Sequence, residues 1–200
     1  MLLALTPDSG APSSVAARPR SVAPERALMD AIRSGDEQLA PQVYAGLLPT
    51  VHATLGRVLG SPCRGVETLT RRSIEQTITE ISSHPSPWVC KLAAWATAVS
   101  ARLALDVLRS RARSRGVEVS WGDTMTQASG DDPRTGAPGS AIDRLRWLLA
   151  ELPLQQAEAI VLCDVMGLAP TEVAVILGVG LEHIRRLLCA GHERLARSLA

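Results

Sequence analysis

Apolar residues recur at three- and four-residue steps along two long stretches of this chain, residues 25–115 and 142–200. That period places side chains on one face of an α-helix, and alternating strand patterns are almost absent. The chain is 46% hydrophobic but has four tryptophans, one tyrosine and no phenylalanine, so its core must be largely aliphatic. Aliphatic residues and alanine favour helices packed on helices. We therefore predict an all-α fold.

Residues that favour turns and loops separate the helical stretches. Residues 1–24 are rich in Pro, Ser and Ala and are expected to form a flexible N-terminal segment. Residues 116–141 are rich in Gly, Ser, Asp and Pro and are expected to form a flexible linker. The sequence thus predicts two small helical domains, 25–115 and 142–200, joined by this linker.

The longest predicted helix lies at the end of the first domain. Ser86 is expected to cap it and Pro87 to start it. Its apolar stripe is expected to contain Trp88, Leu92, Trp95, Val99, Leu103 and Val107. Residues 102–115 hold five arginines against one acid, Asp106, and are the most basic part of the chain. Such a basic end suits nucleic-acid phosphates, although arginines at a helix C-terminus also complement the helix dipole.

Proline and glycine divide the second domain into helices. Pro153 is expected to end a helix whose apolar stripe is formed by Ile142, Leu145, Leu148, Leu149 and Leu152. A second helix is expected at about 155–166, with Gly167 as the left-handed residue after it.

The stretch LAPTEVAVILGVGLEHIRRLL, residues 168–188, has the pattern of a helix-turn-helix. Pro170 suits the first turn of a helix, and Gly178 suits the tight turn between two helices. The outward positions of the second helix are where a DNA major groove would lie, and they hold Glu182, His183, Arg185 and Arg186. The alternative is an ordinary helical hairpin with a solvated polar face. Residues 142–200 have six arginines against seven acids, and this net negative charge weakens attraction to phosphates.

Residues 152–199 resemble region 4, the promoter-recognition domain of bacterial RNA polymerase sigma factors, and within that family the small extracytoplasmic-function type. The matching marks are Leu152-Pro153, Glu158, Gly167-Leu168, Glu172-Val173-Ala174, Gly178 and Glu193-Arg194-Leu195. The chain departs from the family pattern at Ala157, Ala169, Gly180, Leu187, Ala190 and His192. The resemblance implies that the helix carrying Arg185 reads the −35 promoter element.

Residues 27–60 resemble the opening of sigma region 2, through Gly35-Asp36-Glu37, Val43-Tyr44, Pro49 and Leu59-Gly60. The long helix after it is similar to the sigma helix that contacts the −10 element. The resemblance implies that this contact, or one with nearby phosphates, is made by Arg102, Arg109, Arg111 and Arg113.

Residues 67–81 correspond to the stretch that docks sigma factors on core RNA polymerase. The residues expected at this docking surface are Glu67, Leu69, Arg71, Arg72 and Ile74. The family has an acidic run here, whereas this chain has Thr68, Arg71 and Arg72 at the positions of Asp, Gln and Glu.

The resemblance implies a divergent sigma factor that binds core polymerase and directs it to promoters through their −10 and −35 elements. Promoter DNA and core RNA polymerase are the expected partners, and an anti-sigma factor is a further candidate. The alternative is a sigma-derived helix-turn-helix regulator, or an interaction protein, that does not dock on core polymerase.

Other classes of function find little support in the sequence. No catalytic motif or phosphate loop is present, and the histidines His52, His84, His183 and His192 lack acidic partners in any motif, so we expect no enzyme and no cofactor. The four cysteines have no metal-ligand spacing and are expected to be small buried residues in a reducing compartment. No run of about 18 apolar residues is present, and MLLALTPDSG lacks a basic start, so we expect a cytoplasmic protein without membrane insertion.

Overall fold

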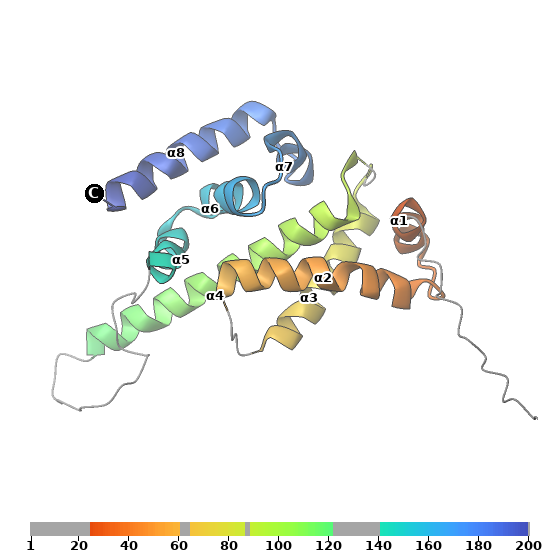
Figure 1. The fold of residues 1–200 in the computed structure, drawn as a ribbon, viewed down its shortest axis with the longest axis horizontal. Coiled ribbons are helices and arrows are strands. Elements are labelled where there is room, and N and C mark those ends of the chain that lie inside the picture. The colour runs from red at the N-terminus through yellow and green to blue at the C-terminus, as the bar shows by residue number, and fades with distance from the viewer. Residues whose placement is uncertain (1–24, 61–64, 87–88, 122–140, 200) are drawn as a thin grey trace, which may run out of the picture.

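The computed structural model of the chain describes residues 25–60, 65–86, 89–121 and 141–199 (Figure 1). All regular secondary structure within these ranges is helical, which confirms the predicted all-α fold. The expected flexible segment 1–24 and most of the expected linker lie outside the described residues.

The first helical unit is formed by α1 (Glu25–Ser34), α2 (Ala40–Leu59), α3 (Val66–Ser83) and α4 (Leu92–Trp121), and we call it the N-terminal unit. Helices α2 and α3 pack against α4, and α1 packs on α2 and α3. The apolar side chains between them are aliphatic, as the composition requires. They include Leu47, Val51, Leu55, Ile74 and Ile81, each no more than 2% exposed.

The second helical unit, called the C-terminal unit, contains α5 (Ala141–Glu151), α6 (Leu154–Ile160), the π-helix η2 (Val161–Val165), α7 (Pro170–Ile176) and α8 (Leu181–Leu199). The predicted breaks at Pro153 and Gly167 are confirmed, and Gly167 has a φ of 75°. The helix predicted over 155–166 is regular only to Ile160. Its last turn widens into η2, where the Met166 N–H donates to the Val161 carbonyl at 2.9 Å.

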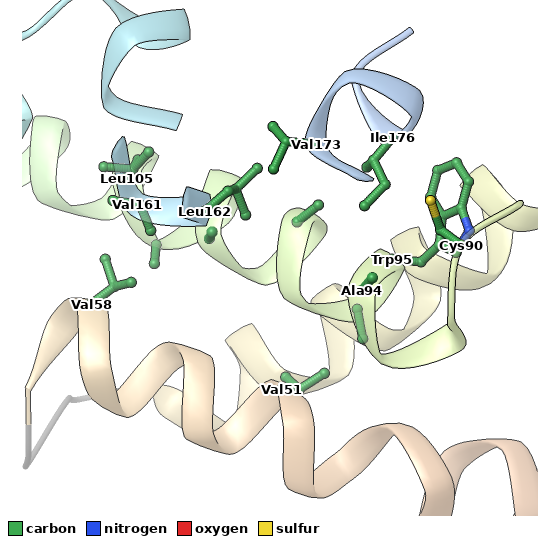
Figure 2. Packing of buried hydrophobic residues seen from close by; sticks show 14 of the residues in the cluster. Val51, Val58, Cys90, Ala94, Trp95, Leu105, Val161, Leu162, Val173 and Ile176 are labelled. Carbon is green, nitrogen blue, oxygen red and sulfur yellow. The ribbon is translucent and has the colours of Figure 1, made fainter. Parts of the chain in front are cut away.

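Helix α4 lies at the centre of the molecule, with the rest of the N-terminal unit on one side and the C-terminal unit on the other (Figure 1). Figure 2 shows Val51 and Val58 of α2 facing one side of α4, and Leu162 and Val173 of the C-terminal unit facing the other. Helix α4 therefore belongs to one hydrophobic core shared by both units.

Burial from both sides distinguishes α4 from the helix that the sequence predicts. The sequence predicts one apolar stripe, but α4 is buried almost all round between Ala94 and Leu105. A helix covered on all sides needs small residues where its neighbours come close. Alanines supply them, since Ala96, Ala101 and Ala104 are completely buried.

Three local expectations are wrong. Helix α4 begins at Leu92 rather than at Pro87, which lies with Trp88 outside the described residues, and it continues to Trp121. The stripe on α5 is only partly buried, because Ile142 is 60% and Leu145 39% exposed while the other three leucines are buried. The cysteines differ among themselves, since Cys90 is buried, Cys163 half-buried and Cys189 exposed.

Helices α6 and α8 approach closely at Gly191, and this contact generates a stability prediction. A Cβ atom at Gly191 would lie 2.6 Å from Ile160 Cδ1, which is buried in the core. Gly191→Val should therefore overpack the contact and lower the free energy of unfolding by about 2 kcal/mol. The control is Ala196→Val, on an exposed position of the same helix. Urea unfolding followed by circular dichroism measures both, and equal values for the two variants would contradict the prediction.

Candidate nucleic-acid interface

Helices α7 and α8 form a compact helix-turn-helix. Helix α7 begins at Pro170, and the Glu172 carboxylate accepts a hydrogen bond from the Ala169 N–H at 3.1 Å. Gly178, with a φ of 66°, makes the turn, and the next N–H, that of Val179, donates to the Ala174 carbonyl at 2.9 Å. A left-handed φ strains residues that carry a Cβ, which is why glycine suits this position.

Helix α8 turns one face to the core and another to solvent. Ile184 is completely buried, with Leu187 and Leu188 packed beside it. On the opposite face Glu182, Arg185 and Arg186 are exposed, and Arg185 forms an ion pair with Glu182 while its side chain remains 61% exposed. The helix-turn-helix thus presents two neighbouring arginine side chains to solvent.

His183, the fourth residue expected on this face, lies differently. It is half-buried and lines a crevice formed mainly by α6, the turn and α8. The other residues around this crevice include Arg102 of α4, Glu158 of α6 and Leu177 of the turn. His183 therefore faces this crevice beside α6 rather than joining the exposed arginines.

Arg102, the first arginine predicted to contact nucleic acid, lies between two carboxylates. Its Nε donates to Glu158 Oε1 of α6 at 2.8 Å, and its Nη1 donates to Glu80 Oε1 of α3 at 3.0 Å. The Glu158 side chain is only 8% exposed and that of Arg102 is 29% exposed. Arg102 thus forms an ion pair that crosses from one unit to the other.

Opposing effects act on the pKa of Arg102. Burial lowers the pKa of the guanidinium, whereas the hydrogen bond and charge of Glu158, followed by those of Glu80, raise it. The net result is a pKa above the usual value for arginine, so Arg102 remains charged at any pH at which the protein is folded.

Arg109 contacts the C-terminal unit in a second way. Its Nη2 donates at 2.9 Å to the carbonyl of Leu152, just beyond the last residue of α5. A reciprocal contact runs back, because Arg146 Nε of α5 donates at 2.9 Å to the Val58 carbonyl near the end of α2. Carbonyls at helix C-termini lack intrahelical partners and carry partial negative charge. Each unit thus supplies an arginine that caps a helix of the other.

Two further arginines of α4 lie closer to solvent. Arg111 and Arg113 are both exposed, and Arg111 borders a small pocket beside Trp147 of α5. The arginines that the sequence predicts to contact the −10 element therefore fall into two pairs. Arg102 and Arg109 donate hydrogen bonds to the C-terminal unit, whereas the side chains of Arg111 and Arg113 are exposed.

The residues expected to dock on core polymerase lie along α3 in different environments. Glu67, Arg71 and Arg72 are exposed, and Arg71 pairs with Glu75 at 2.8 Å within the same helix. Leu69 is half-buried, and Ile74 is 2% exposed in the core. The exposed part of this helix face is thus charged, while the apolar part packs inward.

Sequence reasoning missed the roles of Glu158 and Arg146, which bind the two units together. Glu158 stands between two alanines in a stretch that is otherwise apolar. This position could have indicated that its carboxylate is buried against a partner. Nothing in the sequence indicated the partner of His192, whose Nε2 lies 2.6 Å from Asp164 Oδ2, 28 positions away in the chain. Both groups are about half-exposed.

The described residues also bear on metal binding and membrane insertion. No cluster of three or more histidine, cysteine, aspartate or glutamate side chains among them could hold a metal ion. Within the same ranges, no helix is both long and apolar enough to span a membrane.

No protein-family model matches the chain, and no curated protein matches it. Among solved structures, the chain is similar to the sigma factor RpoE in its co-crystal structure with the anti-sigma factor NepR from Bartonella quintana. The two chains are 19% identical, the match covers 84% of this chain and 97% of the other, and the TM-score is 0.46. At this degree of similarity, a functional proposal must rest on the residues of this chain.

The cysteines near this interface should differ in reactivity. Burial, followed by the charge of Asp164, raises the pKa of the Cys163 thiol to about 11. At pH 8 only about one in a thousand Cys163 thiols is then ionised, so iodoacetamide should alkylate it about 100-fold more slowly than exposed Cys189. The Cys163 rate should rise with pH until about pH 11, as peptide mass spectrometry can measure. Equal rates for the two cysteines at pH 8 would contradict this assignment.

Proposed function

We propose that the chain is a sigma-factor-like transcription initiation protein, which joins core RNA polymerase and directs it to promoters. The observation that carries the proposal is the solvent-exposed face of α8 in a helix-turn-helix, with Arg185 and Arg186 side by side. This is the geometry in which a second helix enters a DNA major groove, with a glycine turn behind it. The sigma-like marks of both units support the same function.

The proposed mechanism is attachment to promoter DNA at two points. Residues Glu182, His183, Arg185 and Arg186 of α8 contact the −35 element, and Arg102, Arg109, Arg111 and Arg113 of α4 contact the −10 region or its phosphates. The contact through α8 alone is weak, because the C-terminal unit has more acids than arginines. Linking two weak contacts through one chain raises the effective concentration of the second.

The proposed partners are promoter DNA and core RNA polymerase, in the cytoplasm. The polymerase-facing residues are Glu67, Leu69, Arg71, Arg72 and Ile74 of α3, of which the exposed charged ones would make direct contact. An anti-sigma factor is a further candidate partner.

A second candidate function is favoured by the surface of α3. Arg71 and Arg72 are exposed where an acidic docking run would be expected, so this face lacks the acidic character of that run. Under this alternative, the chain is a helix-turn-helix regulator, or an interaction protein, that binds no core polymerase.

Binding to core polymerase separates the two candidates. Purified core polymerase should be recovered with the full chain in a pull-down, and Arg71→Glu alone should not abolish recovery. Run-off transcription on genomic DNA with the same polymerase should then give start sites that share an upstream motif. If core polymerase is not recovered under clean conditions, the second candidate replaces the first.

The role of the α8 arginines can be tested on duplex DNA of mixed sequence. Replacing both Arg185 and Arg186 with alanine should weaken binding and reduce the slope of log affinity against log salt by about 2, because each phosphate contact contributes about 0.9. The matched control replaces Arg194 and Arg197, two exposed arginines near the other end of the same helix. Fluorescence anisotropy across a salt series gives both slopes. Equal losses of affinity and of salt dependence in the two double variants would show that the outer face of α8 does not contact DNA.

A further inference from the structure

We propose that Trp147 of α5 and Arg111 of α4 form a binding site for one unpaired base of a single-stranded nucleic acid. In this site the base stacks on the indole ring, and the phosphate beside it meets the guanidinium. The site deepens the proposed function and rests on it only for the source of the strand, since transcription initiation exposes unpaired bases when a promoter opens. Trp147 belongs to neither set of residues assigned above to the promoter elements.

Trp147 lies at the surface of a chain that has few aromatic residues. It is 45% exposed, whereas Trp95 of α4 is 2% exposed in the core. The buried face of α5 is formed instead by Leu148 and Leu149, together with Leu152 just beyond the helix. A large ring that combines an apolar body with an exposed surface, and that the core does not need, is available for a ligand.

The indole lies beside a small pocket at the boundary between α4 and α5, two helices that pack against each other. The pocket has a volume of about 90 Å³, and its walls include Leu108, Arg111 and Ala112 of α4 and Asp143, Trp147 and Ala150 of α5. A cavity of this size is far smaller than one that encloses a whole ligand. It therefore takes one edge of a planar ring, while the rest of the nucleotide lies outside against the indole.

The charged groups around the pocket favour a phosphate. Arg111 is exposed at the pocket, and Arg113 is exposed two residues further along α4. The acid beside them, Asp143, already accepts a hydrogen bond from Arg146 Nη1 at 3.1 Å, and this ion pair offsets its charge. Arg146 is also held by the Val58 carbonyl, to which its Nε donates at 2.9 Å. The charge beside the indole is therefore positive overall.

An indole with an arginine beside it matches the two parts of a single strand. The bases of a single strand have free faces that stack on aromatic side chains, while arginines follow the phosphates. In a duplex these faces are covered by the neighbouring base pairs, so a duplex cannot use the indole. A free nucleotide is usually held through its phosphates by a glycine-rich loop or a helix N-terminus. This pocket has no glycine in its lining, and the first turn of α5 carries the acid Asp143.

Trp147→Ala tests the stacking surface directly. It should weaken binding of a short, fluorescein-labelled single strand of mixed sequence about tenfold at low salt, because one base loses its stacking partner. The matched control is Ile142→Ala, which truncates a 60% exposed side chain on the same helix, outside the lining of the pocket. The control should bind like the parent chain. Fluorescence anisotropy gives the affinities, and equal values for the two variants, or no binding by the parent chain, would overturn the proposal.

Trp147→Phe keeps an aromatic ring at the site and provides a second test if Trp147→Ala does not fold. It should bind the strand within about threefold of the parent chain, because a phenyl ring also stacks on a base. Unlabelled strand should quench the tryptophan emission of the parent chain, and the quenching that is missing in Trp147→Phe is that of Trp147. Identical quenching of the two chains would overturn the proposal.

Arg111→Gln tests the phosphate contact. It should reduce the slope of log affinity against log salt by about 0.7, the value for one phosphate contact in a single strand. Arg144→Gln is the control, because Arg144 is exposed on α5 outside the lining of the pocket and carries the same charge. A reduction of the slope as large in Arg144→Gln as in Arg111→Gln would overturn the role of Arg111.

Two further ligands identify the source of the base. A duplex of the same sequence should leave the emission of Trp147 unchanged, because its base faces are covered. Free mononucleotides at the same total nucleotide concentration should quench far less than the strand, because they lack the neighbouring phosphates that Arg111 and Arg113 attract. Quenching by either ligand equal to that by the strand would overturn the assignment to single strands.

These measurements need neither core polymerase nor a promoter. Failure to recover core polymerase would therefore remove the proposed function and leave the single-strand result unchanged. Conversely, loss of the dependence on Trp147 would remove this site alone, while the pull-down and the duplex measurement on α8 still decide the proposed function.

Discussion

Burial of α4 on both sides is the constraint on which the rest of the structure depends. Because Ala96, Ala101 and Ala104 carry only a methyl group, helices can lie close against α4 from opposite directions. The C-terminal unit covers a side that would otherwise expose Leu105 and neighbouring apolar groups to water. The positions of the helix-turn-helix and of the arginines on α4 both follow from this shared core.

The polar contacts across that core mainly specify how the two units dock against each other. Exchanging a buried ion pair for apolar residues is often neutral for stability, but removing one partner costs about 3–5 kcal/mol because it leaves a charge unpaired. The Arg102–Glu158 pair therefore disfavours any docking of α6 on α4 that separates these two groups. The caps made by Arg109 and Arg146 add directional requirements at two other places. Together these contacts select one relative placement of the two units.

Local patterns in the sequence predicted the local features well. The apolar period predicted helices, and Pro153, Gly167 and Gly178 marked breaks and a turn that the structure confirms, because their backbone restrictions act within a few residues. Features that depend on distant packing were not predictable in this way. The periodicity of α4 indicated one apolar face, and nothing near Arg102 in the sequence shows that Glu158 lies beside it. The exposure of Ile142 and the burial of His183 likewise depend on which surface each helix meets.

The π-helical turn η2 sets the rotation of the helix-turn-helix about the axis of α6, the helix that precedes it. A hydrogen bond from Met166 to Val161 spans five residues where a regular helix spans four, so this turn holds one additional residue. Without that residue, everything after it would be rotated by about 100° around the axis of α6. Insertions or deletions between Val161 and Val165 would therefore re-aim Arg185 and Arg186 without altering either helix that carries the motif. The direction in which the motif points is thus encoded outside the motif.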